Sequence, residues 1–366
     1  MKFRVFPLSV FLLIVLSCPV YSQTWTDVSP PWDATNTEDD SMAIYGSNLY
    51  VGTWNGGGGQ VWRYNGTIWT NVTPPWDAAN TEAWYMAAYG SSLYVGTDNP
   101  GGAQVWRYNG TSWADVTPPW DAANTIAESI AVYGTNLYVG TFNGGGAQVW
   151  RYNGTSWADV TPPWDAANMN AYSLALYGTN LYVGTGNGGG AQVWRYNGTT
   201  WADVSPPWGA ANTLAPFMTA YEANLYVGTF NGGGAEVWQY NGTTWTNVTP
   251  PWDAANTSAF SLAVYGRTLH VGTGNGGGAQ VWQYGGTTWT DVSPPWGAAN
   301  VLAPFMVAYD ANLYVGTLND GGAQVWRLQL PPTSVSAMNE WGMILFMSLA
   351  GLGSIYYLKR RRKTEN

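Results

Sequence analysis

One segment of 44 residues recurs along most of this sequence, and it limits the possible fold more than any other feature. Each copy begins with the pattern W-[TA]-[DN]-V-[ST]-P-P-W, and the first tryptophans of the copies are Trp25, Trp69, Trp113, Trp157, Trp201, Trp245 and Trp289. Repeats of about 40 to 50 residues with four short strands each are the size of one propeller blade. The sequence therefore predicts an all-β fold, a seven-bladed β-propeller over residues 23–330.

The strands and turns of a blade can be read from the third copy. The expected strands are residues 129–134, 136–141, 147–152 and 156–161, where apolar and polar residues alternate as in half-buried strands. Asn153-Gly154 is a strong two-residue hairpin signal, because both positions accept a positive φ at little cost. A blade of four antiparallel strands follows from this pattern.

The two ends of the repeat region predict how the ring closes. The first copy begins with a lone fourth strand, residues 25–29, and the last copy stops after a third strand, residues 323–328. These two incomplete pieces make one blade. We expect the N-terminal strand to pair with the three C-terminal strands, which closes the ring and leaves no exposed sheet edge.

The glycine-rich run "NGGG" at residues 143–146 raises the question of a phosphate site. A phosphate-binding loop continues into a Lys, a Ser or Thr and a helix. Here the chain continues "AQVWRY", which favours another strand. The run is therefore predicted to be a turn.

The repeat pattern "VGT…GG…RYNG…W" is similar to known propeller families. Over about residues 24–330 it resembles the kelch-type propellers and equally the propellers of bacterial periplasmic sensor proteins. Gly140-Thr141 stands where kelch repeats carry a double glycine after the second strand. The resemblance implies a propeller fold and leaves the function open.

The N-terminus has the features of a secretory signal peptide. Lys2 and Arg4 precede an apolar run at residues 6–16, and small residues near Ser22 suit a signal peptidase. Residues 1–22 are therefore predicted to direct export and to be removed. The only cysteine, Cys18, would leave with them, unless it is a lipidation site instead.

The C-terminus predicts a membrane segment. After a linker at residues 331–340, the apolar run 341–358 is long enough for a transmembrane helix, and the basic tail 359–366 is expected in the cytoplasm. This region also resembles the C-terminal sorting signals read by exosortase-type enzymes. The positions that match or nearly match that signal are Val335, Met338, Glu340, Trp341 and Gly342, while Ser336 and Ala337 replace its Pro-Thr.

The sorting resemblance implies that a processing protease of the exosortase type removes the tail. The protein would then reach the cell surface or be released. Without that processing, the same segment is a simple membrane anchor that holds the propeller outside the cytoplasm.

The residue types present limit the metal sites and catalytic groups that are possible. The only histidine, His270, stands where six other copies carry Tyr, so we interpret it as a drifted tyrosine. Without a second histidine or a mature cysteine, soft metal sites and His-activated nucleophiles are excluded. We expect no cofactor and no metal, and we expect the protein not to be an enzyme.

Five aspartates recur in the "PPWDAAN" loops. Ring symmetry would keep them apart, so they are not expected to pair for acid/base catalysis, and an Asx turn is the simplest role for each. Calcium ligation is the alternative. These aspartates are Asp33, Asp77, Asp121, Asp165 and Asp253.

Charge excludes one class of partner. Residues 24–330 contain six arginines against 20 Asp and Glu residues, a net charge of −14. Nucleic acid is therefore not an expected partner, because phosphate binding requires clustered cations.

One face of the ring is the predicted binding face. The connections between second and third strands and between blades share this face, and the copies differ most there, although drift after duplication is an equal explanation. The candidate ligand-binding residues that vary between copies are of two kinds. The residues before a loop asparagine are Trp54, Asp98, Phe142, Phe230 and Leu318, and one residue of an expected inner strand is Trp84. Seven loop tryptophans either wedge between blades or stack on sugars: Trp32, Trp76, Trp120, Trp164, Trp208, Trp252 and Trp296.

These features predict an exported, cell-surface-directed propeller that acts as a non-enzymatic binding or adhesion module for glycan or protein ligands. The alternative is a structural surface or matrix component without a discrete ligand, and an enzyme ranks third.

Overall fold

The structure is a computed structural model that describes residues 24–329. The expected signal peptide (1–22), linker (331–340), transmembrane segment (341–358) and basic tail (359–366) lie outside the described residues. Within residues 24–329, no helix is long and apolar enough to cross a membrane.

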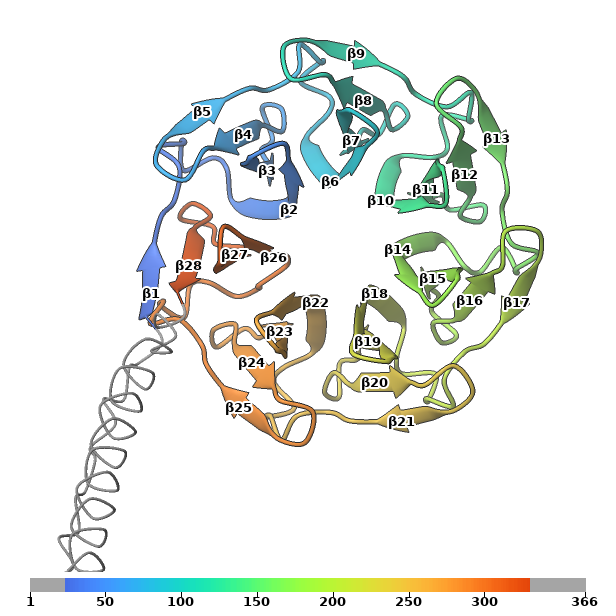
Figure 1. Cartoon of the computed structure of the whole chain (residues 1–366), viewed down its shortest axis with the longest axis vertical. Coiled ribbons are helices and arrows are strands. Elements are labelled where there is room, and N and C mark those ends of the chain that lie inside the picture. The colour runs from blue at the N-terminus through green and yellow to red at the C-terminus, as the bar shows by residue number, and fades with distance from the viewer. Residues whose placement is uncertain (1–23, 330–366) are drawn as a thin grey trace, which may run out of the picture. The chain divides into compact units, whose positions relative to one another are not determined.

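Seven four-stranded antiparallel blades stand around a central axis, as the repeat predicts (Figure 1). In each blade the first strand faces the axis and the fourth lies at the periphery (Figure 1). Blade 1 is β2 (Glu38–Tyr45), β3 (Asn48–Trp54), β4 (Val61–Tyr64) and β5 (Trp69–Asn71). Blade 2 is β6 (Glu82–Tyr89), β7 (Ser92–Asp98), β8 (Val105–Tyr108) and β9 (Trp113–Asp115). Blade 3 is β10 (Ile126–Tyr133), β11 (Asn136–Phe142), β12 (Val149–Tyr152) and β13 (Trp157–Asp159).

The remaining blades repeat this order. Blade 4 is β14 (Asn170–Tyr177), β15 (Asn180–Gly186), β16 (Val193–Tyr196) and β17 (Trp201–Asp203). Blade 5 is β18 (Leu214–Tyr221), β19 (Asn224–Phe230), β20 (Val237–Tyr240) and β21 (Trp245–Asn247). Blade 6 is β22 (Ser258–Tyr265), β23 (Thr268–Gly274), β24 (Val281–Tyr284) and β25 (Trp289–Asp291). Blade 7 is β26 (Met306–Tyr309), β27 (Asn312–Gly316), β28 (Val325–Gln329) and β1 (Thr24–Asp27).

Strand bounds in the third copy differ from the sequence-based expectation at both ends. The inner strand β10 begins at Ile126 rather than residue 129, because its first residues pair with the end of β11. The outer strand β13 ends at Asp159 rather than residue 161. Beyond Asp159, the Thr161 hydroxyl accepts a hydrogen bond from the amide of Val149 at 3.0 Å. A side-chain oxygen therefore takes the place of the backbone carbonyl that would continue the strand pairing.

The ring closes as predicted, through the N-terminal strand. β1 is the outermost strand of blade 7, beside β28, and the amide of Val28 donates to the carbonyl of Val325 at 2.8 Å. The indole of Trp25 donates to the carbonyl of Val292 in blade 6 at 2.7 Å. The same inter-blade bond recurs around the ring, for example from Trp69 to Val28. Residues from both ends of the chain therefore fill one blade and its junction.

The core lies between neighbouring blades. At one junction, Tyr50 and Val61 of blade 1 pack with Met86, Leu93 and Val95 of blade 2 in a single buried cluster. Burial of apolar surface of this kind is the main force that holds successive blades together.

The glycine-rich run is a turn, as predicted. The amide of Gly146 donates to the carbonyl of Asn143 at 2.9 Å, and Gly145 donates to the Asn143 side chain at 2.8 Å. Gly146 has a φ of +119°, a conformation that residues with a Cβ rarely adopt. The run therefore reverses the chain between β11 and β12.

Candidate ligand-binding pocket

The inner strands of blades 1 to 6 share an irregularity in their pairing, and in five of these strands it leaves a single residue unpaired. In blade 1, Asp39 pairs with Thr53 and Ser41 pairs with Gly52, so Asp40 between them has no partner. Such a β-bulge bends the strand and re-aims the extra side chain. The equivalent unpaired residues in blades 2, 3, 4 and 6 are Trp84, Glu128, Tyr172 and Phe260.

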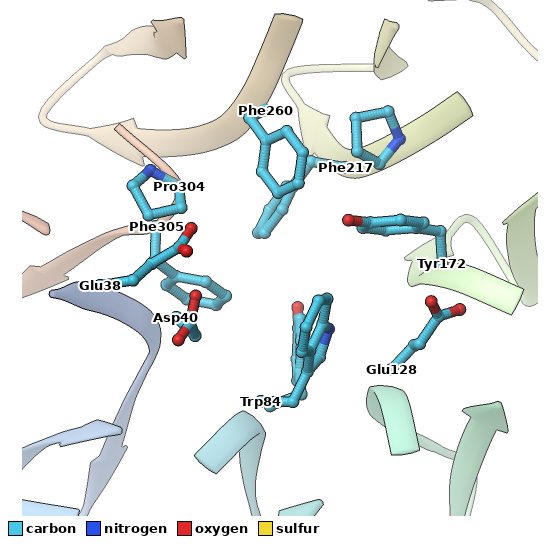
Figure 2. A pocket seen from close by; sticks show the side chains of 11 residues that line it. Glu38, Asp40, Trp84, Glu128, Tyr172, Phe217, Phe260, Pro304 and Phe305 are labelled. Carbon is cyan, nitrogen blue, oxygen red and sulfur yellow. The ribbon is translucent and has the colours of Figure 1, made fainter. Parts of the chain in front are cut away.

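The bulge residues converge on a pocket at the centre of the ring (Figure 2). The pocket has a cavity volume of about 100 Å³, within about 470 Å³ of space that includes its open mouth. Its lining comes from all seven blades and consists of Glu38, Asp40, Trp84, Tyr85, Glu128, Tyr172, Pro216, Phe217, Phe260, Pro304 and Phe305.

The pocket carries carboxyl groups at two places, on either side of Trp84 (Figure 2). Glu38 and Asp40 of blade 1 lie at one place, with Glu82 of blade 2 beside Asp40, and Glu128 of blade 3 lies at the other. Burial raises the pKa of Glu38, Asp40 and Glu82 well above the ordinary carboxyl value. The charges of neighbouring carboxyl groups raise these pKa values further, whereas a hydrogen bond with Asp40 lowers the pKa of Glu82 and one with Glu38 lowers that of Asp40. These groups therefore hold protons more tightly than exposed carboxylates do.

Glu128 is the most secluded acid of the lining, with 1% of its surface exposed. Its Oε1 accepts a hydrogen bond from the Asn170 side chain, and its Oε2 has no hydrogen-bond partner. Burial raises the pKa of Glu128 to about 8. One oxygen of this carboxyl group is thus buried without a donor.

The described residues bring no basic side chain to the lining of the pocket. Residues 24–329 contain six arginines and no lysine. Arg63, Arg107, Arg151, Arg195 and Arg327 lie on third strands, and Arg267 lies in the turn between β22 and β23. The acids of the pocket therefore have no protein cation to balance them within residues 24–329.

Aromatic rings make up much of the remaining lining. Trp84 makes an edge contact with Tyr172 at 6.4 Å between ring centroids, and Tyr172 makes another with Phe260 at 5.7 Å. At the next position of the repeat, Phe305 contacts both Tyr85 and Phe217, with 5.3 Å between ring centroids. Blades 1, 3, 4 and 6 carry serine at that position. Two connected groups of rings therefore form the apolar wall.

Asp39 is a buried acid outside the pocket lining. It is fully buried, and neither carboxyl oxygen has a hydrogen bond of standard geometry. Burial raises its pKa well above the ordinary value, and the backbone of Thr317 offsets only part of this rise. Its six equivalents in the other blades are alanines. A Cβ placed on Gly316 would lie 2.5 Å from the Asp39 Cβ, so this junction is already tight.

Replacement of Asp39 by alanine is therefore expected to stabilise the propeller. The change removes a buried polar group without such a hydrogen bond, which costs about 1 to 3 kcal/mol, and it restores the residue of the other blades. Urea denaturation at neutral pH should show a higher midpoint for Asp39→Ala than for the wild type. An unchanged or lower midpoint would show that Asp39 has a stabilising partner.

The predicted rim residues lie around the pocket and not in its wall. Trp54, Asp98, Phe142, Phe230 and Leu318 each pair with the first residue of the next inner strand, for example Trp54 with Glu82. They are therefore on the pocket's face of the ring, and Trp54 and Phe230 are 38% and 36% exposed. Of the predicted site residues that lie within residues 24–329, Trp84 alone lines the pocket.

The loop tryptophans lie at the junctions between blades. Trp76 donates its indole hydrogen to the carbonyl of Gly59 in blade 1 at 3.0 Å and makes an edge contact with Trp106 in blade 2. The other loop tryptophans donate to the equivalent carbonyls: Trp32, Trp120, Trp164, Trp208, Trp252 and Trp296. This geometry agrees with the expectation that the loop tryptophans wedge between blades. Their stacking on a sugar stays a prediction.

The loop aspartates form Asx turns. The side chain of Asp77, for example, accepts a hydrogen bond from the amide of Ala79 at 2.9 Å. The equivalent hydrogen bond is present at Asp33, Asp121, Asp165 and Asp253. Residues 24–329 contain no group of three or more His, Cys, Asp or Glu side chains arranged to hold a metal ion.

His270 occupies the site of a buried tyrosine. It is fully buried, its equivalents include Tyr50, Tyr138 and Tyr226, and neither ring nitrogen has a side-chain hydrogen-bond partner. Burial lowers the pKa of His270 to about 4, so the ring is neutral at pH 7. This environment fits the interpretation of a drifted tyrosine.

Sequence reasoning missed most of the pocket. It treated carboxylates as separated by the ring, which holds for the loop aspartates but not for Glu38, Asp40 and Glu82, which lie together. The available signal was the position of Asp40 in the repeat, where the seven copies carry Asp, Trp, Glu, Tyr, Pro, Phe and Pro.

Comparisons with known proteins extend the fold assignment. No family model matches the chain. No curated protein matches it either. Solved structures do: a catalytically inactive variant of virginiamycin B lyase from Staphylococcus aureus with quinupristin has a TM-score of 0.68 and 10% identity, over 85% of this chain and 100% of that one.

Two further solved structures are similar to the chain. The GH74 xyloglucanase from Xanthomonas campestris has a TM-score of 0.62 and 16% identity, over 83% of this chain and 53% of its own. The extracellular domain of a putative hybrid two-component system from B. thetaiotaomicron has a TM-score of 0.60 and 18% identity, over 83% and 39%. At these identities the likeness establishes the fold alone: the chain is a β-propeller built of repeated four-stranded blades.

Proposed function

We propose that this chain is an exported, non-enzymatic binding protein that holds part of a glycan or protein ligand in its central pocket. The observation that carries the proposal is the convergence of the non-repeated bulge residues on one cavity, while the blades around them stay nearly identical. Pockets with an apolar wall and a few convergent polar groups are the usual form of a ligand site.

The location of the protein belongs to the same proposal. The N-terminal signal peptide would deliver the propeller outside the cytoplasm, and the C-terminal segment would act as an anchor or as an exosortase-type sorting signal that is cleaved. The kelch-type or sensor-type likeness of the repeats is compatible with this role.

Cell fractionation tests the location. The propeller is expected at the cell surface or in the medium, and a variant truncated after residue 330 is expected to be released. Recovery of the full chain in the cytoplasm alone would contradict the export proposal.

Glycan and peptide arrays test the binding function. The full chain is expected to bind some array members saturably, and Trp84→Ala should lose at least about tenfold in affinity, because it removes one ring of the pocket wall. The matched control is Ile68→Ala, since Ile68 is 63% exposed in the hairpin between β4 and β5. Saturable binding that Trp84→Ala leaves intact would move the site elsewhere, and no binding on either array would favour the structural-component alternative.

One observation favours a second candidate, an enzyme. Carboxyl groups with raised pKa values beside one cavity are the groups that acid/base hydrolysis of sugars uses, and the propellers compared above include a lyase and a xyloglucanase. Incubation of the full chain with a panel of polysaccharides would reveal reducing ends if the chain is a glycosidase. Product formation that Glu128→Gln abolishes would replace the binding proposal with this one.

A further inference from the structure

Within residues 24–329, no basic side chain balances the carboxyl groups of the pocket. Glu38, Asp40 and Glu128 face the cavity, and the arginines of residues 24–329 lie on third strands and in one turn, away from the lining. A buried carboxylate needs a cation or a hydrogen-bond donor to offset its lost hydration. Glu128 has neither at Oε2, although it is 1% exposed and lines the cavity.

The aromatic part of the lining supplies a second kind of cation recognition. The faces and edges of Trp84, Tyr172 and Phe260 surround the same space that Glu128 borders (Figure 2). The π-face of an aromatic ring attracts a cation within about 6 Å of its centroid, and tryptophan does so best. Aromatic rings with a nearby carboxylate are a suitable site for an alkylammonium ion, whose methyl or methylene groups need apolar contact.

We propose that the ligand group held in the central pocket is an organic ammonium ion, with Glu128 and Asp40 as its counter-ions and Trp84, Tyr172 and Phe260 as its aromatic enclosure. This inference rests on the proposed binding function and adds the charge and chemical class of the bound group. The cavity volume of about 100 Å³ suits a small head group and not a whole sugar chain or peptide.

Protonation should be linked to binding. Because the pocket carboxyl groups have raised pKa values, some of them are neutral near pH 7, with Glu128 titrating at about 8. A bound cation stabilises the ionised form and lowers those pKa values, so binding releases protons. Affinity for an ammonium ion is therefore expected to rise as the pH increases from 5 to 8.

Isothermal titration calorimetry of the full chain with choline tests the proposal. The control probe is 3,3-dimethyl-1-butanol, which has the same shape without the charge. At pH 8, choline should bind at least about tenfold more tightly than 3,3-dimethyl-1-butanol, a difference of about 1.4 kcal/mol in binding free energy. Equal affinities would show that the pocket recognises apolar shape and would overturn the proposal.

Two substitutions test whether Glu128 supplies the negative charge that binds choline. Glu128→Gln should lower choline affinity about tenfold and leave the alcohol unaffected. Glu236→Gln makes the same chemical change in blade 5, where Glu236 accepts hydrogen bonds from Asn212 and Trp238 and the other blades carry Gln. It should leave both affinities unchanged. Choline affinity that is the same in Glu128→Gln and the wild type would also overturn the proposal.

Further probes identify the source of the ammonium group. Selective binding of glucosamine over N-acetylglucosamine indicates an amino sugar, and binding of Nα-acetyl-lysine amide indicates a peptide side chain. Either result supports the proposal. Array binding that depends on Trp84, together with no binding of choline, glucosamine or the lysine derivative, would reject the ammonium ligand and leave the proposed binding function intact.

Discussion

Replacement of Gly140 by valine is expected to destabilise the propeller by at least about 3 kcal/mol, the upper range for overpacking a closely packed core. A Cβ at Gly140 would lie 2.5 Å from the carbonyl oxygen of Ala171 in the next blade, 2.5 Å from the Ser129 hydroxyl and 2.7 Å from the Ala171 Cβ. The Ser129 hydroxyl also donates to that carbonyl at 2.6 Å. The new side chain would therefore push two blades apart and break a buried hydrogen bond.

Chemical denaturation followed by tryptophan fluorescence measures this effect. The matched control is Gly144→Val in the same blade, because a Cβ there meets nothing within 4 Å and the residue does not have a positive φ. We expect the control to change the unfolding free energy by less than about 0.5 kcal/mol. Equal midpoints for the two variants would show that the blades do not approach each other as closely as the structure indicates.

The second large effect is a loss of stability as the pH rises. Asp39, Asp40, Glu82 and Glu128 have raised pKa values in the folded state, so the folded chain binds more protons than the unfolded chain above about pH 4.5. Stability therefore falls with increasing pH in that range and levels off above the folded pKa. For Glu128, a folded pKa of about 8 corresponds to a change on the order of 4 kcal/mol between pH 4.5 and 8.

Unfolding free energies measured between pH 4.5 and 8.5 test this dependence. Glu128→Gln should flatten part of the slope, since the amide cannot ionise and still accepts a hydrogen bond from Asn170 through its carbonyl oxygen. Wild-type stability that increases through this range would contradict the burial of these acids.

The sequence predicts the propeller well because the relevant signals are local and repeated. The period of 44 residues, the Asn-Gly hairpins and the incomplete first and last copies set the number of blades and the way the ring closes, and the structure confirms each. Strand ends were less predictable. The end of β13 depends on the Thr161 hydroxyl, which competes with the backbone for the Val149 amide.

The pocket was harder to predict because a bulge interrupts the alternation of a strand. With regular alternation, Asp40 and Trp84 would have ordinary cross-strand partners and would not be singled out from their neighbours. The slip between Asp39 and Ser41 turns this position towards the axis, and it depends on pairing with β3. The acids of the pocket occupy two repeat positions, Glu38 and Glu82 at one and Asp40 and Glu128 at the other, and most copies carry other residues there.

The bulge has a consequence for how such a protein can change over evolution. The same repeat position lines the pocket in all seven blades, and its residue ranges from carboxylates to prolines on nearly the same scaffold. Residues that serve the pocket are therefore largely separate from those that hold the blades together. A single mutation in one repeat, or the exchange of one repeat for another, can thus alter what the ring recognises while the architecture persists.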